Sequence, residues 1–367
     1  MNLLVKVMAQ DYSGFADSVY NAVANGIGPS IIFNYGSTAI DYAAENLAVD
    51  ISKYITEDLK KGDSFMNDLI DSLPDALKTD VKGFSDGGIY YLPGCTTGPV
   101  FFYNKTIFDE LELTPPKDWD ELADVSKKIY EAKGIPGFHS DGLVDNIQMM
   151  IMQNNLGYID TKSKKVLFGG DKLAEIYQWY ADNCHKGYFQ FNTVGRYASE
   201  DLANGTIASF SGSCVNDQYI TMLTGSLGMA PWISSSNGRS FYTAWNRGPI
   251  FLSRNEKVDR GAYEFVKFFL SPKMNALWAI ANSALSPYGT TQETSEYQSY
   301  INNLPASSAL PCVQANLDVS GSFPNVTGGS QVRNILVEYL NKVVDGKMTA
   351  KDAVDALVKD CNEALKD

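Results

Sequence analysis

The stretch that decides the fold runs from Gly88 to Asp124 and reads GIYYLPGCTTGPVFFYNKTIFDELELTPPKDWDELAD. An aromatic run ends at a Pro-Gly turn, and a second aromatic run, PVFFYN, follows over Pro99–Asn104. Because proline and glycine interrupt regular structure, these runs are predicted to be separate extended segments. A short helical piece, Lys105–Leu111, then leads to a Pro-Pro break, and Trp119-Asp-Glu-Leu indicates the start of a further helix.

Strand and helix patterns alternate before this stretch. Leu3–Met8 and Ser30–Tyr35 are apolar runs rich in β-formers, and an amphipathic helix is predicted between them at Tyr12–Ala24. A second helix is predicted over Ser37–Leu47. This alternation favours βαβ units, an α/β fold and a largely parallel sheet.

The chain after Trp119 is predicted to be mainly helical, with a strand at Thr206–Phe210. The predicted helices are Trp119–Lys133, Asn146–Leu156, Asp171–Cys184 and a C-terminal pair from Val332 on, split at Gly346.

Length and composition bound the class of protein. The chain has 367 residues, which is long for a single core, so two lobes are expected. Hydrophobic residues make up 44% and charged residues 20%, and no apolar run approaches the roughly 20 residues of a transmembrane helix. The net charge of −13 excludes nucleic acid and anionic lipid as partners, and it helps to keep the protein soluble.

The residues that usually carry metal, cofactor or catalytic chemistry are scattered. The five cysteines show no C-x-x-C pair, and the two histidines, His139 and His185, lie far apart in sequence. No P-loop, G-x-S-x-G or H-E-x-x-H pattern is present, and acidic pairs such as Asp109-Glu110 fit solvated helix faces. We therefore expect no metal, no cofactor and no catalytic residues.

The order of residues in the deciding stretch resembles the hinge-crossing segment of family 1 extracellular solute-binding proteins, the sugar-type receptors of bacterial ABC importers. That segment reads roughly G-x-x-Y-x-x-P, a short loop, L-Y-Y-N-K-x-x-F, and then P-P-K-T-W-D-E-L. The matching positions here are Gly88, Tyr91, Pro93, Phe102, Tyr103, Asn104, Lys105, Phe108, Pro115, Pro116, Lys117, Trp119, Asp120, Glu121 and Leu122.

The resemblance implies a two-lobe periplasmic-binding-protein fold of the larger, sugar-type class, in which the chain crosses the hinge three times. Crossings are expected near Asn104, Thr243 and Tyr288, at extended or Gly/Pro-marked stretches. The N-terminal lobe is then predicted to comprise residues 1–104 and 244–288. Residues 105–243 and 289–367 would form the C-terminal lobe.

In the family, a lipoprotein signal, a first strand and its helix precede the pattern with which this chain begins. MNLLVKVMAQ lacks the features of a signal peptide, so we expect that the native N-terminus is missing, although a naturally shorter variant is an alternative. The full-length protein is expected outside the cytoplasm, as a cell-surface lipoprotein or in the periplasm.

Candidate ligand-binding residues follow predicted strands, where strand ends and helix N-termini of the two lobes would face an interlobe cleft. Each candidate also has an alternative interpretation. The small polar residues could make local turn or capping bonds, Trp245 could pack in the core, and Arg247 could form a surface ion pair. The candidates are Asn34, Tyr35 and Ser37 with neighbouring Gly36 and Thr38; Thr96 and Thr97 beside Cys95; Ser211 and Ser213 with Asn216; and Trp245, Asn246 and Arg247.

The loop Phe138–Leu143 stands where family members often place an aromatic that stacks on the ligand. This chain has no tryptophan there, so His139, Ser140 and Asp141 are weaker candidates, and a solvated loop is the preferred interpretation.

The resemblance implies capture of a mono- or oligosaccharide by hinge closure and delivery to the transmembrane subunits of an ABC permease, with the binding protein a monomer. The end of the chain, with Phe323-Pro324-Asn325 and Gln331-Val332-Arg333, is similar to receptors for glycerol 3-phosphate and glycerophosphodiesters. However, Leu317–Ser330 lacks the phosphate-binding arginine of those receptors. Two rival hypotheses are a carbohydrate-active enzyme and a truncated remnant that binds nothing.

Overall fold

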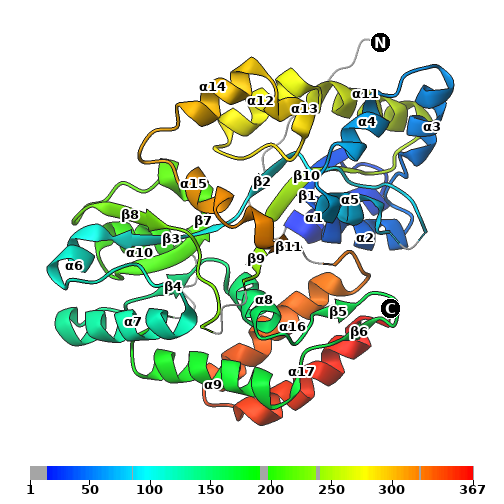
Figure 1. Cartoon of the computed structure of the whole chain (residues 1–367). Coiled ribbons are helices and arrows are strands. Elements are labelled where there is room, and N and C mark those ends of the chain that lie inside the picture. Colours follow the sequence, from blue (N-terminus) through cyan, green and yellow to red (C-terminus); the bar gives the residue numbers. More distant parts are fainter. Residues whose placement is uncertain (1–14, 85, 191–196, 237–239, 322–323, 367) are drawn as a thin grey trace. The chain divides into compact units, whose positions relative to one another are not determined.

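The computed structural model of the chain describes residues 15–84, 86–190, 197–236, 240–321 and 324–366 (Figure 1). It divides into two compact units. The first unit comprises Met1–Thr96, Trp245–Leu304 and Pro324–Thr327, and the second comprises Thr97–Ala244, Pro305–Phe323 and Gly328–Asp367. The strand predicted at Leu3–Met8 lies outside the described residues.

The first unit is a small sheet covered by helices. Its sheet has the strand order β1-β10-β2, and β2 ends at the boundary with the second unit. The elements are α1 (Phe15–Ala24), β1 (Ile31–Tyr35), α2 (Gly36–Ala44), α3 (Ser52–Lys60), α4 (Phe65–Asp71), α5 (Asp75–Lys82), β2 (Cys95–Thr97), β10 (Trp245–Phe251), α11 (Glu256–Phe269), α12 (Pro272–Ala281), α13 (Gly289–Gln292) and α14 (Ser295–Asn302).

The core of the first unit forms where β10 meets the helices that follow β1. Ile250, Phe251 and Leu252 are almost fully buried, and they belong to one apolar cluster with Ile51 of the α2–α3 connection and Tyr263 of α11. The second half of β10, from Gly248 to Phe251, is buried at every position, because both faces of the strand are covered there.

The expectation of a largely parallel sheet is wrong. β1 pairs antiparallel with β10, and in the second unit β3 pairs antiparallel with both β7 and β8. Parallel pairing is found between β4 and β7 and between β9 and β11. The alternation of strands and helices at the start of the chain suggested parallel pairing, but the strand that pairs with β1 is β10, which is not the next strand along the chain. It returns to β1 after a long excursion through the second unit, and local periodicity does not encode its direction.

The second unit is larger and more helical. Its elements are β3 (Pro99–Asn104), α6 (Lys105–Glu110), α7 (Trp119–Lys133), β4 (His139–Ser140), α8 (Leu143–Gln153), β5 (Ile159–Asp160), β6 (Lys165–Val166), α9 (Gly170–His185), α10 (Ala198–Asn204), β7 (Ser209–Ser213), the 3-10 helix η1 (Cys214–Gln218), β8 (Leu227–Ala230), β9 (Tyr242–Thr243), α15 (Leu310–Gln314), the 3-10 helix η2 (Leu317–Val319), β11 (Ser320–Gly321), α16 (Gly329–Val344) and α17 (Ala350–Ala364).

The main sheet of the second unit has the order β4-β7-β3-β8, and β3 is its most buried strand. The aromatic run PVFFYN, Pro99–Asn104, forms this strand. Phe101 and Phe102 are fully buried, and Phe102 stacks on Phe210, its directly opposite partner in β7, with ring centroids 5.1 Å apart. Cross-strand aromatic pairs of this kind stabilise a sheet and fix its register.

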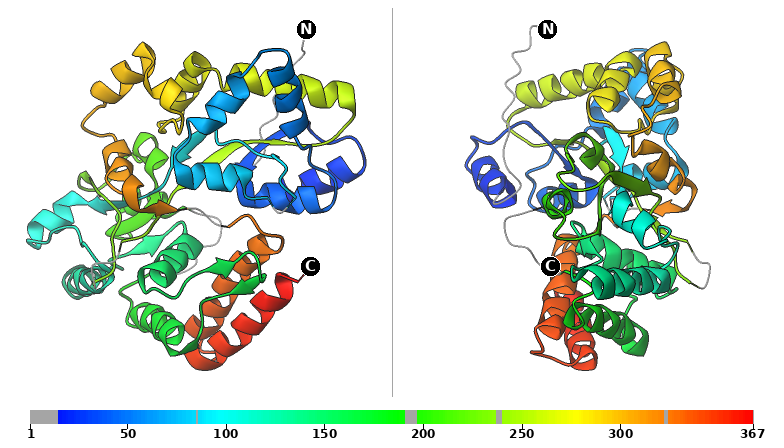
Figure 2. Two further views of the ribbon diagram at one scale, coloured as in Figure 1. Left: turned by 45° about the vertical axis from the view of Figure 1, so that its right-hand side comes forward. Right: turned by 90° about the vertical axis from the view of Figure 1, so that its left-hand side faces the viewer.

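A helical layer formed by α9, α16 and α17 completes the second unit. The three helices contact one another and lie side by side in every view (Figures 1 and 2). The hydroxyl of Tyr177 in α9 donates a hydrogen bond of 2.7 Å to the carbonyl of Leu336 in α16, which ties these two helices together in the interior. The predicted C-terminal helical pair is therefore confirmed, and Gly346 lies in the turn between α16 and α17.

Local sequence signals set the helix ends. The side chain of Asp118 accepts the backbone N–H of Glu121 at 2.8 Å and caps α7, and Gly134 ends this helix in the left-handed conformation with φ 70°. The observed bounds of α7 are those predicted. Asn255 caps α11 and Thr349 caps α17 in the same way as Asp118 caps α7.

The division into units differs from the predicted lobes in three segments and at Ala244, which belongs to the second unit. Residues 97–104 belong to the second unit, because β3 is hydrogen-bonded between β7 and β8. Residues 289–304 belong to the first unit, because α13 and α14 pack against α12. The short segment Pro324–Thr327 also belongs to the first unit, where the side chain of Asn325 donates to the carbonyl of Asp80 at 2.6 Å.

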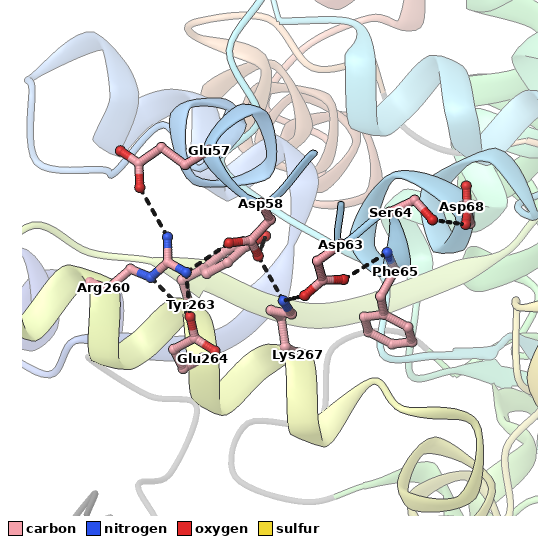
Figure 3. Close-up of polar contacts among 10 residues, drawn as sticks. All are labelled: Glu57, Asp58, Asp63, Ser64, Phe65, Asp68, Arg260, Tyr263, Glu264 and Lys267. Carbon is pink, nitrogen blue, oxygen red and sulfur yellow. Dashed lines mark hydrogen bonds and ion pairs between the residues drawn. The ribbon is translucent and has the colours of Figure 1, made fainter. Parts of the chain in front are cut away.

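A network of charged side chains joins α3 to α11 in the first unit (Figure 3). Its centre is Asp58, whose side chain is 6% exposed. Asp58 accepts hydrogen bonds from Arg260 at 2.8 Å, Lys267 at 2.6 Å and Tyr263 at 3.0 Å. Burial alone would raise the pKa of Asp58, but these donors outweigh it and lower the pKa to about 2.

This network predicts acid sensitivity of the first unit. Since the folded-state pKa of Asp58 is lowered, its contribution to stability is present above about pH 4 and is lost as the pH falls toward 2. We expect Asp58→Asn to lower the free energy of unfolding at neutral pH by roughly 2 kcal/mol and to flatten its decline below pH 4. Urea denaturation over a pH series measures both effects.

The matched control is Glu57→Gln, which removes a 51% exposed partner of Arg260 from the same network. Exposed ion pairs contribute about 0–1 kcal/mol, so this variant should keep the wild-type pH profile. If both variants shift the profile equally, Asp58 is not the centre of the network.

Candidate functional site

The ligand-binding candidates of the first unit meet where β1 ends and β10 begins. The antiparallel register sets Tyr35 opposite Arg247 and Asn34 opposite Gly248. Because directly opposite side chains lie on the same face of a sheet, Tyr35 and Arg247 share one face. Trp245, two residues along β10, lies on that face too. A tyrosine, a guanidinium and an indole, all half-buried, thus converge from segments far apart in sequence.

The opposite face of β10 holds a buried hydrogen-bond pair. Thr96 of β2 donates its hydroxyl to the side-chain oxygen of Asn246 at 2.7 Å, and the hydroxyl of Tyr91 donates to the backbone carbonyl of Asn246. Thr96 and Asn246 are 5% and 6% exposed. The hydroxyl of Thr96 thus bonds a side chain distant in sequence and not its local backbone, and the two contacts give Asn246 a fixed orientation.

The start of α2 supplies the remaining candidates of the first unit. The side-chain oxygen of Asn34 accepts the backbone N–H of Tyr35 at 2.9 Å, which shapes the turn from β1 into the helix. Ser37 is buried in the first turn of α2. The first N–H groups of a helix have no partner within it, so this turn can present donors beside Tyr35.

The second unit brings other candidates together at the ends of β4 and β7. The hydroxyls of Ser211 and Ser140 lie 2.9 Å apart, and the side-chain amide of Asn146 in α8 donates to Ser140 at 2.9 Å and to Ser211 at 3.2 Å. Ser213 caps η1, accepting the N–H of Val215 at 3.4 Å. Thr97, at the boundary of the unit, is buried.

Asn146 was missed by sequence reasoning, which treated its segment only as a helix. The available signal was an asparagine beside the apolar residues of α8 that face the core. A buried amide in such a position needs hydrogen-bond partners, and here they are the serines of two strand ends.

The interpretation of Phe138–Leu143 as a solvated loop is wrong for His139. His139 and Ser140 form β4, and His139 is 7% exposed because it pairs with Phe210 in the interior of the sheet. Burial lowers the pKa of His139. Asp141, directly after the strand, is exposed as a residue, but one of its oxygens accepts the N–H of Ala198 at 2.8 Å.

The described residues offer no metal centre, because nowhere in these ranges do three or more His, Cys, Asp or Glu side chains gather. The five cysteines, all within the described ranges, form no disulfide, and burial raises the pKa of the thiols of Cys95, Cys184, Cys312 and Cys361. None of the helices in the described part of the chain combines the length and apolarity that a bilayer crossing requires.

The model of the family described as bacterial extracellular solute-binding protein matches residues 4–276. The chain belongs to this family. Similar members of the solute-binding family include the sn-glycerol-3-phosphate-binding periplasmic protein UgpB of Rhizobium meliloti (strain 1021), which is 24% identical over 363 residues, covering 92% of this chain and 80% of the relative. UgpB of Salmonella typhimurium (strain LT2) is 25% identical over 309 residues, covering 78% and 69%.

Solved structures of solute-binding proteins share the fold. An ABC substrate-binding protein from Listeria monocytogenes in complex with cycloalternan gives a TM-score of 0.82 at 17% identity, covering 97% of this chain and 89% of that one. The cyclic alpha-maltosyl-1,6-maltose binding protein from Arthrobacter globiformis gives 0.77 at 20% identity, covering 96% and 89%. The predicted fold, α/β and of the sugar-type periplasmic-binding class, is confirmed.

Gly248 is the position in this solute-binding protein on which the first-unit cluster depends. The segment that contains Leu92 and Gly94 runs against β10, with the N–H of Gly94 donating to the carbonyl of Arg247 at 2.8 Å. A Cβ on Gly248 would lie 1.9 Å from the carbonyl oxygen of Leu92 and 2.4 Å from the nitrogen of Gly94. Only glycine lets these two backbones approach so closely.

Gly248→Ala should therefore lower the free energy of unfolding by about 1–3 kcal/mol, the usual cost of forcing atoms into a packed site. Gly289→Ala is the control, because a Cβ there meets nothing closer than the carbonyl of Ser72 at 3.8 Å. Urea denaturation of both variants tests the claim. Equal stability of the two variants would contradict it.

Proposed function

We propose that this protein is an ABC-importer receptor that binds a mono- or oligosaccharide through the polar clusters of its two units. The observation that carries the proposal is the shared face of Tyr35, Trp245 and Arg247 in the first unit. Flat aromatic rings suit the C–H faces of sugars, and the neighbouring polar groups suit their hydroxyls. Membership of the extracellular solute-binding family supports the same conclusion.

The proposed mechanism is a shift of population by the ligand. A solute that binds more tightly to the closed arrangement than to the open one shifts the population toward the closed arrangement. The closed protein then engages the transmembrane subunits of an ABC permease. We propose that the receptor works as a monomer. It binds and releases its ligand without changing it chemically, so it has no catalytic activity.

The proposed location is outside the cytoplasm, which agrees with the description of the family as extracellular. Whether the native protein is a cell-surface lipoprotein or a periplasmic protein stays a prediction from the resemblance. The predicted lobes and the predicted ligand residues likewise stay part of this proposal.

A second candidate ligand is glycerol 3-phosphate or a glycerophosphodiester. Two observations favour it: the UgpB relatives are named as sn-glycerol-3-phosphate-binding, and Arg247 lies opposite Tyr35. A guanidinium can bind phosphate through two hydrogen bonds. If phosphate is the ligand, Arg247→Gln abolishes its binding, whereas neutral sugars lose little.

The test is ligand titration followed by thermal shift and calorimetry, using glucose, maltose, maltotriose, ribitol and sn-glycerol 3-phosphate. We expect at least one neutral carbohydrate to raise the melting temperature as its concentration rises. Trp245→Ala should weaken binding of that carbohydrate about ten-fold, equivalent to about 1.4 kcal/mol, through loss of the stacking face.

Phe268→Ala is the matched aromatic control, because Phe268 lies on α11 in the first unit and is 58% exposed. It should leave affinity unchanged. A wild-type protein that is stabilised by none of these probes would contradict the proposed function, and stabilisation by sn-glycerol 3-phosphate alone would favour the second candidate.

A further inference from the structure

The carboxylate of Asp141 in the second unit is held in a fixed position beyond the end of β4. One oxygen accepts the N–H of Ala198 at 2.8 Å, and the side chain also bonds the amide of Asn216. Both groups lie against Gly212: a Cβ there would be 3.0 Å from the other Asp141 oxygen and 2.7 Å from the Asn216 nitrogen. Glycine at position 212 thus makes room for this carboxylate–amide pair.

The fixed carboxylate still has acceptor capacity. Each carboxylate oxygen can accept about two hydrogen bonds, and the donors from Ala198 and Asn216 use only part of that capacity. Asp141 is exposed as a residue and its hydrogen bond with Ala198 is only partly buried, so a ligand can approach the carboxylate from the open side, although protein groups displace part of its hydration. Beside it, the backbone N–H of Asp141 bonds to the carbonyl of Ser211 at 3.0 Å, which joins it to the Ser140–Ser211–Asn146 group.

Two tyrosines next to this carboxylate expose their rings. Tyr197 immediately precedes Ala198, the residue that donates to Asp141, and it is 60% exposed. Tyr219 donates its N–H to the carbonyl of Asn216 at 3.0 Å and is 72% exposed. Exposed aromatic rings beside convergent polar groups are typical of binding surfaces, because the rings have apolar area that water solvates poorly.

We propose that Asp141, with the exposed rings of Tyr197 and Tyr219, forms a subsite in the second unit that accepts hydroxyls of a neutral sugar and disfavours phosphate esters. This inference rests on the proposed function and specifies its ligand class. A carboxylate accepts hydrogen bonds from sugar hydroxyls, whereas it repels the negative charge of a phosphate. The subsite therefore argues against the ligand for which the UgpB relatives are named.

The charges around Asp141 act in the same direction. Asp201 of α10 adds a second negative charge, with one oxygen accepting the amide of Gln190 at 2.9 Å. His139 of β4 is the titratable base nearby, and burial favours its neutral form. Asn216 of η1 is uncharged. Loss of hydration, with a smaller contribution from Asp201, raises the pKa of Asp141 to about 6.

The raised pKa gives the subsite a pH signature. Below about pH 6 the carboxylate becomes protonated and loses acceptor capacity, so sugar affinity should fall between pH 7.5 and pH 5. Asp141→Asn keeps an oxygen for the N–H of Ala198 and removes the charge, so it should also remove this pH dependence. A pH dependence that persists in Asp141→Asn would contradict the role of Asp141.

The experiment is calorimetry at pH 7.5 and pH 5 with sn-glycerol 3-phosphate and with the neutral carbohydrate that stabilises the wild type most. At pH 7.5, Asp141→Asn should weaken binding of the neutral carbohydrate at least ten-fold. The same variant should bind sn-glycerol 3-phosphate as tightly as the wild type or more tightly. Asp355→Asn, on an exposed position of α17, is the charge-matched control and should behave as the wild type.

The tyrosines are tested by paired substitutions. Tyr197→Phe and Tyr219→Phe keep the ring and should retain affinity, whereas the alanine variants should weaken binding of the neutral carbohydrate about five- to ten-fold.

Unchanged carbohydrate affinity in Asp141→Asn overturns the subsite, even where Trp245→Ala weakens binding and the proposed function stands. Tighter binding of sn-glycerol 3-phosphate than of every carbohydrate by the wild type overturns the inference as well. A protein that binds none of the probes contradicts the proposed function itself.

Discussion

The antiparallel pairing of β10 with β1 is the constraint on which the first unit depends. It returns a segment from beyond residue 244 to a strand near the beginning of the chain, and it sets Tyr35 beside Arg247. On β10, Gly248 has no side chain, so the backbone from Leu92 to Gly94 can pass directly against this strand. The pairing of the two backbones thus brings the candidate ligand-binding side chains of Tyr35, Trp245 and Arg247 to one face of the sheet.

The second unit uses a different device, a buried aromatic strand at the centre of its sheet. β3 places Phe101 and Phe102 between β7 and β8, and this packing holds the end of β7 where Ser211 meets Ser140 and Asn146. β3 is buried at every position except Tyr103, and the hydrogen bonds among Ser140, Ser211 and Asn146 fix the directions of their side chains. Rigid hydrogen-bonding groups lose little freedom when a ligand binds, which favours affinity and selectivity.

The two clusters differ in charge, and this difference bears on the ligand. The first unit offers a guanidinium beside aromatic rings, whereas the second offers a carboxylate beside exposed tyrosines. Both combinations are compatible with a neutral polyhydroxyl ligand, because hydroxyls donate to carboxylates and accept from guanidinium groups. An anionic ligand would be attracted by Arg247 and repelled by Asp141.

The sequence by itself determined the local elements and the family. The capped helix Trp119–Lys133, the buried run PVFFYN and the helical pair around Gly346 are each fixed by neighbouring residues, and the ordered motif between Gly88 and Leu122 sufficed for the family. Only the tertiary structure decided which distant residues meet. The antiparallel sense of β10, the burial of His139 and the bonds of Asp141 to Ala198 and of Asn146 to Ser211 join segments that no local periodicity links. Their positions follow from chain closure and side-chain packing over the whole unit, which a pattern of neighbouring residues does not record.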